Sequence, residues 1–165
     1  MEWLDVIQNP ILKDLPFKIE LNKFGKLLMS PASNDHGRVQ SRLAAMLLNN
    51  LPKGEVITKC SIQTLDGVKV ADVAWLSEAF VSEFGFITPY PKAPEICIEI
   101  VSPSNSKIEI QEKIDLYLAK GAQEVWVAYA LDNIDIYTCM GIVDQSDIVT
   151  AIGTTSGSHA VRGNQ

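Results

Sequence analysis

Hydrophobic residues alternate with polar ones over several short segments of the chain, which is the pattern of half-buried β-strands. Residues 17–31 contain two such segments joined by a turn, so an N-terminal β-hairpin is expected there. Residues 55–65 and 68–76 form a second pair, rich in β-branched residues and separated by Asp66-Gly67. The first half of the chain therefore predicts two antiparallel hairpins.

Two segments show the spacing of amphipathic helices. The first follows the cap-forming residues 32–35 and ends at Leu51-Pro52, with apolar positions at Val39, Leu43, Met46 and Leu47. In the second, Ser106 and Glu109 have the spacing of a capping box, so we expect that helix to begin near Lys107 and to end at Gly121. Both helices would present one apolar stripe to a sheet.

The second half of the chain adds three more predicted strands. Residues 95–101 form a nearly continuous apolar run and predict a buried strand, while 124–130 and 133–139 surround a turn. Residues 77–94 contain three prolines and a glycine and read mostly as loop. The order is hairpin, helix, three strands, helix and two strands, which predicts an α/β (α+β) fold with a mixed sheet flanked by helices.

Length and composition favour one domain. The chain has 165 residues, of which 47% are hydrophobic, enough for a single core. The sequence after residue 139 is small and polar towards its end and shows no recoverable pattern. We therefore expect a single domain over residues 1–139 and a loosely ordered tail over 140–165.

The charge balance limits the classes of partner. Twenty acidic against 14 basic residues give a net charge of −6, which argues against non-specific coating of nucleic acid or an anionic membrane but leaves room for a local basic groove. The three cysteines are widely spaced and form no metal-binding or disulfide pattern. With no export signal and no apolar run of about 20 residues, a cytoplasmic protein without a membrane partner is expected.

Two carboxylates interrupt segments that otherwise read as core strands. Asp72 shares its strand face with apolar residues, and Glu99 lies between Ile98 and Ile100. An isolated buried carboxylate costs several kcal/mol, so such a residue usually has a cation, a hydrogen-bond donor or a metal beside it. Two carboxylates on neighbouring strands could share one Mg²⁺, which proteins hold with one or two carboxylates plus water and phosphate oxygens.

Lys113 lies at the edge of the apolar stripe of the second helix, one turn before Tyr117. An ammonium at this position could extend across the sheet towards the two carboxylates. It could orient a water molecule or neutralise charge on a pentacoordinate phosphate.

The chain resembles a known family in four segments that together extend over roughly residues 17–139. It is similar to the Uma-two family of predicted restriction endonucleases, within the PD-(D/E)XK nuclease superfamily. The resemblance rests on "KIELNKFGKLLMSP", "SNDHGRVQSRLAAMLL", "VADVAWL" and "PEICIEIVSPSNSKIEIQEKIDLYLAKGAQEVWVAYALDNIDIY". Its most specific part is Glu99 before Ser102-Pro103-Ser104, followed by Lys113, Tyr117 and Gly121.

The resemblance implies a restriction-endonuclease-like core and a set of site residues. Asp72 takes the role of the first acidic residue and Glu99 that of the second, and both would bind metal. Glu20 matches a family acidic position that completes the site. The superfamily lysine normally follows the second acid by two residues, where this chain has Val101. The resemblance assigns the lysine role to Lys113 on the helix instead.

The resemblance also implies the activity, the cofactor and the partner. It indicates Mg²⁺- or Mn²⁺-dependent hydrolysis of phosphodiester bonds in nucleic acid, with double-stranded DNA as the expected substrate. A local basic strip would have to hold the phosphates, with candidates Lys18, Lys23, Lys26 and Arg38. Restriction-type nucleases often cut both strands as symmetric dimers, so a homodimer is a further expectation.

Other readings of the same residues stay open. Val101 in the usual lysine position favours a nuclease-like module that binds or regulates without turnover, and a purely structural domain is a third alternative. Asp72 could pair with Lys69 or Lys59, and Glu99 could be a solvated edge residue. His36, in the first turn of the first helix, is either a surface residue or a contact to the site or to phosphate.

Overall fold

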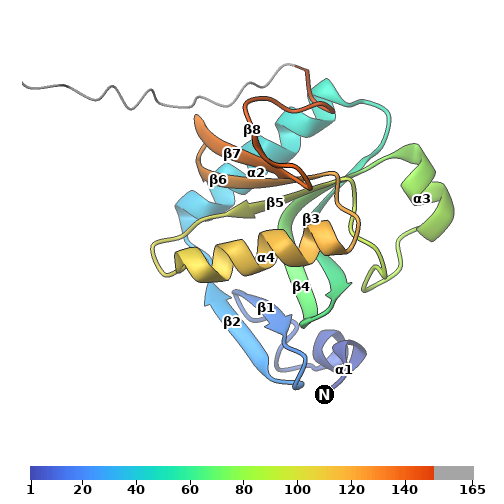
Figure 1. Cartoon of the computed structure of the whole chain (residues 1–165). Helices are drawn as coiled ribbons and strands as arrows, with labels where there is room; N and C mark the ends of the chain where they lie inside the picture. The colour runs from blue at the N-terminus through green and yellow to red at the C-terminus, as the bar shows by residue number, and fades with distance from the viewer. Residues whose placement is uncertain (151–165) are drawn as a thin grey trace, which may run out of the picture.

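The centre of the fold is an eight-stranded mixed sheet in this computed structural model, which describes residues 1–150 (Figure 1). The strand order is β2-β1-β4-β5-β6-β7-β8, and β3 pairs with β4. Among the described strands, β5 and β6 are parallel and the other pairs are antiparallel. The bounds are β1 Phe17–Leu21, β2 Leu27–Pro31, β3 Glu55–Thr64, β4 Gly67–Leu76, β5 Ile96–Ile100, β6 Glu124–Ala130, β7 Asn133–Thr138 and β8 Gly141–Val143.

Two helices cover opposite faces of the sheet. Helix α2 (Asn34–Asn50) packs on the face that carries the β5 isoleucines Ile96, Ile98 and Ile100. Helix α4 (Lys107–Ala119) packs on the other face, against Cys97 of the same strand. Side chains of a strand alternate between its two faces, so Glu99 lies on the α4 side. The predicted α/β (α+β) class is confirmed, with a mixed sheet, flanking helices and an N-terminal hairpin.

The caps of both helices follow from the sequence. The Ser33 hydroxyl accepts a hydrogen bond from the His36 backbone N–H at 3.1 Å and so begins α2. In α4, Ser106 and Glu109 form the predicted capping box, in which each side chain accepts from the other residue's backbone N–H. These bonds satisfy donors that have no partner inside a helix, which is why the helices begin where they do.

Two short helices were not predicted. Helix α1 (Trp3–Gln8) precedes the hairpin, and α3 (Glu78–Phe84) lies in the segment that was read as loop. Each has at most two turns, too few for an apolar period to stand out from background. Ser77 caps α3 by accepting from the Phe80 backbone N–H at 3.1 Å, and this cap was the available signal.

The structure differs from the expected tail over residues 140–150. Strand β8 extends the sheet beside β7, and Ser146 and Val149 are buried. The buried carboxylate of Glu124 holds this segment by accepting from the Ser146 hydroxyl at 2.7 Å and from the Asp147 backbone N–H at 2.8 Å. Long-range contacts of this kind leave no local pattern. The remainder of the predicted tail, residues 151–165, lies outside the described residues.

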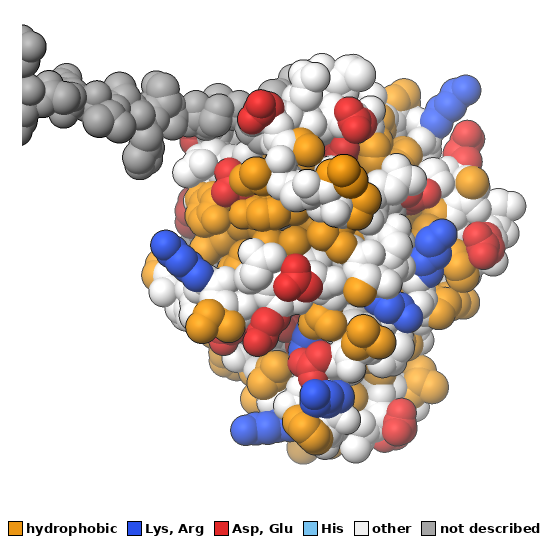
Figure 2. All heavy atoms as spheres, viewed as in Figure 1, with side chains coloured by type: hydrophobic (Ala, Val, Ile, Leu, Met, Phe, Trp, Pro, Cys, Tyr) orange, Lys and Arg blue, Asp and Glu red, His pale blue; other side chains and the backbone are white. Residues whose placement is uncertain are grey.

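The visible surface carries both signs of charge. Figure 2 shows acidic and basic side chains interspersed, with hydrophobic side chains gathered between α4 and the strands behind it. A groove there is lined by Ile114, Leu118 and Tyr137 among others. Within residues 1–150, none of the helices has the length and apolar character needed to cross a membrane.

Candidate active site

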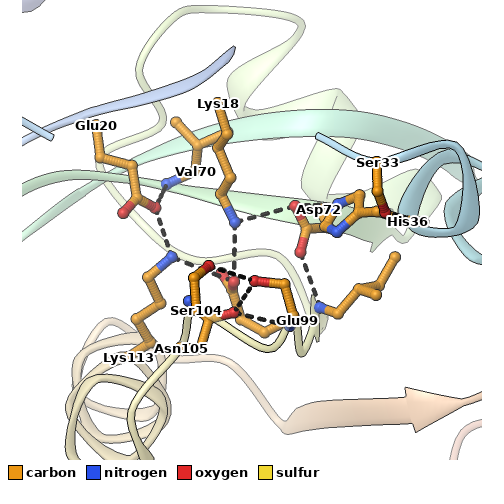
Figure 3. Close-up of polar contacts among 12 residues, drawn as sticks. Lys18, Glu20, Ser33, His36, Val70, Asp72, Glu99, Ser104, Asn105 and Lys113 are labelled. Carbon is orange, nitrogen blue, oxygen red and sulfur yellow. Dashed lines mark hydrogen bonds and ion pairs between the residues drawn. The ribbon is translucent and has the colours of Figure 1, made fainter. Parts of the chain in front are cut away.

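The site lies where two strand ladders along β4 come to an end. Strand β5 pairs with β4 as far as Val73↔Ile98, and β1 pairs with β4 at Leu21↔Val68. Asp72 and Glu99 are the next residues beyond the Val73↔Ile98 pair, so they face each other where the strands separate (Figure 3). Antiparallel neighbours project to the same face, and both carboxylates therefore point into the opening.

Asp72 is 1% exposed, and its carboxylate contacts two side-chain nitrogens and one backbone N–H. Its Oδ1 lies 3.0 Å from the Lys18 Nζ and 3.2 Å from the His36 Nε2, and its Oδ2 accepts from the Ile100 backbone N–H at 2.8 Å. Burial alone would raise the pKa of Asp72, but the Lys18 charge and the hydrogen bonds from His36 and Ile100 outweigh it and hold that pKa well below its usual range. Asp72 is therefore an ionised carboxylate at neutral pH.

Glu99 is 2% exposed and is held from both sides of the opening. Its Oε2 accepts from the Lys18 Nζ at 2.8 Å and from the Lys113 Nζ at 3.2 Å. Its Oε1 accepts from the Tyr117 hydroxyl at 2.7 Å. Burial and the nearby Glu99 charge raise the pKa of Tyr117 well above its usual value, so the phenol stays protonated and donates to Glu99.

Glu20, from β1, is the third buried carboxylate of the site and is 7% exposed. Its Oε1 accepts from the Lys113 Nζ and from the Val70 backbone N–H, both at 2.8 Å. The Val70 N–H belongs to the part of β4 between the two ladders, so the carboxylate replaces a strand partner there. Burial acts to raise the pKa of Glu20, but the charges of Lys113 and Lys18 outweigh it and lower that pKa.

Lys18 is a central residue of the site, although the sequence placed it only in a basic strip. It bridges Asp72 and Glu99, and burial acts to lower its pKa while the charges of Glu99, Asp72 and Glu20 outweigh that and raise it above its usual value. A signal for this role was available, because Lys18 and Glu20 are two residues apart and share one face of β1. His36 likewise contacts Asp72, from the first turn of α2.

The sequence-predicted residues Asp72, Glu99, Lys113 and Glu20 all meet at this opening. The alternative partners of Asp72 do not pair with it: Lys69 pairs with Asp66 at 2.8 Å, and Lys59 makes no ion pair within residues 1–150. In the basic strip, Arg38 pairs with Asp35 and the Lys23 ammonium lies over the Phe24 ring, so only Lys18 of that strip belongs to the site within residues 1–150. The turn that contains Ser102 and Asn105 lines a small cavity of about 30 Å³ in front of the carboxylates.

The arrangement suits a hard divalent cation. Three carboxylates meet two ammonium groups, so the cluster carries one excess negative charge when His36 is neutral. Asp72 and Glu99 share the Lys18 ammonium as their cation, because each directs an oxygen to it. No group of three or more His, Cys, Asp or Glu residues within 1–150 could hold a metal alone. Two protein carboxylates nevertheless match the donor set of Mg²⁺, which completes its shell with water and phosphate oxygens.

Comparisons with known proteins point to nucleases. A family model described as "Uma2: Putative restriction endonuclease" matches residues 11–139. Among solved structures, a "putative nuclease belonging to DUF820" from Anabaena variabilis ATCC 29413 superimposes with a TM-score of 0.67 at 16% identity, covering 82% of this chain and 85% of that chain. At this identity the likeness shows a shared fold. No curated protein matches the chain.

Proposed function

The chain belongs to the Uma2 family, and from this premise we propose that it is a metal-dependent endonuclease that hydrolyses phosphodiester bonds in double-stranded DNA. The observation that carries the proposal is the pair of buried carboxylates, Asp72 and Glu99, which both direct an oxygen at the Lys18 ammonium between them. A purely structural role explains this arrangement poorly, because replacing a buried ion cluster with apolar residues of similar volume is often neutral or stabilising.

Asp72 and Glu99 would hold Mg²⁺ or Mn²⁺ in this proposal. When bound, such an ion polarises the phosphate and lowers the pKa of a coordinated water. Glu20 acts on Lys113, because its Oε1 accepts from that ammonium at 2.8 Å and fixes its position beside Glu99. Glu20 is therefore a positioning residue, and Asp72 and Glu99 are the ligands.

The two lysines supply the charge that a phosphate group needs. An ammonium has three N–H donors, and Lys113 uses two of them on Glu20 and Glu99. The third can donate to a water or to a phosphate oxygen. Lys18 uses two on Asp72 and Glu99, and a metal held by these carboxylates would release the ammonium to donate to phosphate instead. Fixed donors of this kind stabilise negative charge as it develops in a transition state.

The protein has a net charge of −6, so a local group of basic side chains would have to bind the DNA phosphates. Lys18 lies at the opening, and Lys23 and Lys26 lie in the turn of the same β1–β2 hairpin. A symmetric homodimer would provide two such basic surfaces for one duplex and is part of the proposal. So is a cytoplasmic location, which accords with cysteines that form no disulfide.

A second candidate is a nuclease-like module that binds nucleic acid without turnover. This candidate is favoured by the ion pairs of the site. Lys18 and Lys113 each bridge two carboxylates, so the cluster is stabilised without a metal ion. Val101 also stands in the usual position of the superfamily lysine. This candidate predicts DNA binding without Mn²⁺-dependent cleavage.

Cleavage of plasmid DNA in the presence of Mn²⁺ tests the proposal. We expect the parent protein to cut, and Asp72→Asn and Glu99→Gln to lose cutting while they still fold. Glu112→Gln is the matched control, because Glu112 is an exposed carboxylate on α4 next to Lys113. DNA binding by the parent without any cutting would support the binding module instead. Cutting by Glu99→Gln at the parent rate would remove Glu99 from the mechanism.

A further inference from the structure

A second cavity lies beside the candidate active site. It has a volume of about 430 Å³ and is bounded by α1, β1, β3 and the loop 86–90. This volume lies within the range of about 300–1,000 Å³ that is typical of small-ligand pockets. Lys18 lines both this cavity and the small one in front of Asp72 and Glu99. A molecule bound at the carboxylates could therefore extend past Lys18 into the second cavity.

The walls of this cavity are rich in aromatic side chains. Trp3, Phe17 and Tyr90 line it, and Phe86 is 65% exposed on the loop that bounds it. An aromatic-lined space of this size suits a flat aromatic ligand, whose ring can pack against the aromatic side chains.

Two cations line the same cavity without a partner of their own. The ammonium groups of Lys13 and Lys59 make no ion pair within residues 1–150, whereas Lys18, Lys69 and Lys113 all do. Both lysines are exposed. Their charge is therefore available to an anionic ligand, and the combination of aromatic walls with free ammonium groups matches a nucleotide.

Lys59 also has an unusual backbone. Its φ is 54°, which makes it the single non-glycine residue with a positive φ in the described chain. It lies opposite Asp72, between the pairs Thr58↔Val73 and Cys60↔Ala71, and the regular β3–β4 pairing is interrupted there. A long side chain rarely adopts this conformation, and such strain tends to cluster at functional sites.

We propose that this cavity binds a nucleobase of the substrate strand next to the scissile phosphate. The aromatic side chains pack against the base, and Lys13 and Lys59 contact the phosphates that flank it. The inference rests on the proposed nuclease function and extends it, because a base held outside the stack gives the enzyme a contact that depends on base identity or on local unpairing.

Calorimetry with two small probes tests the cavity without cleavage. Deoxyadenosine 5′-monophosphate and 2-deoxyribose 5-phosphate carry the same phosphate, but only the first has a base. With EDTA present, we expect the parent to bind the nucleotide about ten-fold or more tightly than the sugar phosphate, as base stacking on aromatic side chains would give. Equal affinity for the two probes, or binding of neither at millimolar concentration, would overturn the proposal.

Matched variants locate the binding. Phe86→Ala should reduce the preference for the nucleotide, while Phe24→Ala should keep it, since Phe24 is also an exposed phenylalanine but does not line this cavity. Lys59→Gly should weaken binding of both probes and leave the melting temperature equal or higher, because glycine tolerates the positive φ. Lys53→Gly, at an exposed lysine outside the cavity, is its control. Equal effects of the controls would contradict the assignment.

This test separates the cavity from the catalytic proposal. Mn²⁺-dependent DNA cleavage together with equal affinity for the two probes would overturn the nucleobase site and leave the nuclease function standing. Preference for the nucleotide in a protein that never cuts DNA would support the nucleobase site and reject the catalytic proposal alone.

Discussion

Asp72 and Glu99 face each other one residue beyond the last paired residues of β4 and β5, and one ammonium, that of Lys18, lies 3.0 Å and 2.8 Å from their oxygens. Burying two carboxylates at this depth is costly unless a cation lies beside them. The site is therefore a buried ionic cluster in which a lysine lies between two potential metal ligands and three carboxylates meet two ammonium groups.

Removing the ammonium of Lys18 should destabilise the protein and make its stability depend on metal. In Lys18→Met, two buried carboxylates lose their shared cation, and we expect the free energy of unfolding to fall by about 3–5 kcal/mol. Mn²⁺ should then raise the melting temperature of the variant more than that of the parent, because a bound ion restores the missing charge. Thermal denaturation with and without Mn²⁺ measures both effects.

The control for this experiment is Lys23→Met, which removes an exposed lysine of the same hairpin. It should change neither the stability nor the response to Mn²⁺. If Mn²⁺ failed to raise the melting temperature of Lys18→Met, the metal would not bind between Asp72 and Glu99.

Lys113→Met should reduce DNA cleavage by far more than any loss of folded protein accounts for. The substitution removes the donor that contacts Glu20 and Glu99, and with it the N–H that we assign to water or phosphate. Single-turnover cleavage of DNA in Mn²⁺ is the measurement, with a loss of about 100-fold or more expected for a fixed charge of this kind. Lys107→Met is the control at an exposed lysine of the same helix. Unchanged cleavage by Lys113→Met would refute the proposed mechanism even with the fold intact.

Glu124→Gln should loosen the end of the described chain. The carboxylate of Glu124 accepts from the Trp126 indole, the Ser146 hydroxyl and the Asp147 backbone N–H. A glutamine would place an N–H₂ group against at least one of these donors, at an expected cost of about 1–3 kcal/mol. Faster amide hydrogen exchange over residues 147–149 checks this prediction. Glu112→Gln should leave exchange there unchanged, and equal exchange in both variants would show that Glu124 does not hold the segment.

The site should make stability sensitive to acid. Asp72 and Glu20 have pKa values below their ordinary range because of Lys18 and Lys113, although burial opposes the shift. A carboxyl with a lowered folded-state pKa contributes its full stability above the unfolded value of about 4, and that contribution is lost as the pH falls further. We therefore expect the free energy of unfolding of the parent to decrease below about pH 4.

Asp72→Asn provides the comparison, since it removes one of the shifted carboxyls. Its free energy of unfolding should be lower than that of the parent at neutral pH and should decrease less steeply in acid. Denaturant titrations from neutral pH to about pH 3 measure the slopes. Parallel curves for the two proteins would mean that Asp72 is not ionised in the folded state at a lowered pKa.

Elements that rest on local physics could be predicted from the amino-acid sequence alone. The capping box at Ser106 and Glu109, the apolar stripe of α2 and the alternation around Glu99 all act over a few residues, so each could be recognised without a structure. The two buried carboxylates were visible for the same reason, as polar residues in apolar strands. The short helices α1 and α3 were missed because one or two turns do not establish a period.

The tertiary structure decided which of these residues meet. The β4–β5 register, which ends at Val73↔Ile98, places Asp72 opposite Glu99, and no local pattern specifies a register between strands 20 residues or more apart in the chain. The same is true of Lys18, which is 54 residues from Asp72 and 81 from Glu99. The role of Lys18 and the position of Lys59 beside a cavity depend on long-range packing. Only the folded sheet brings β1 and β5 to one edge of β4 and β3 to its other edge.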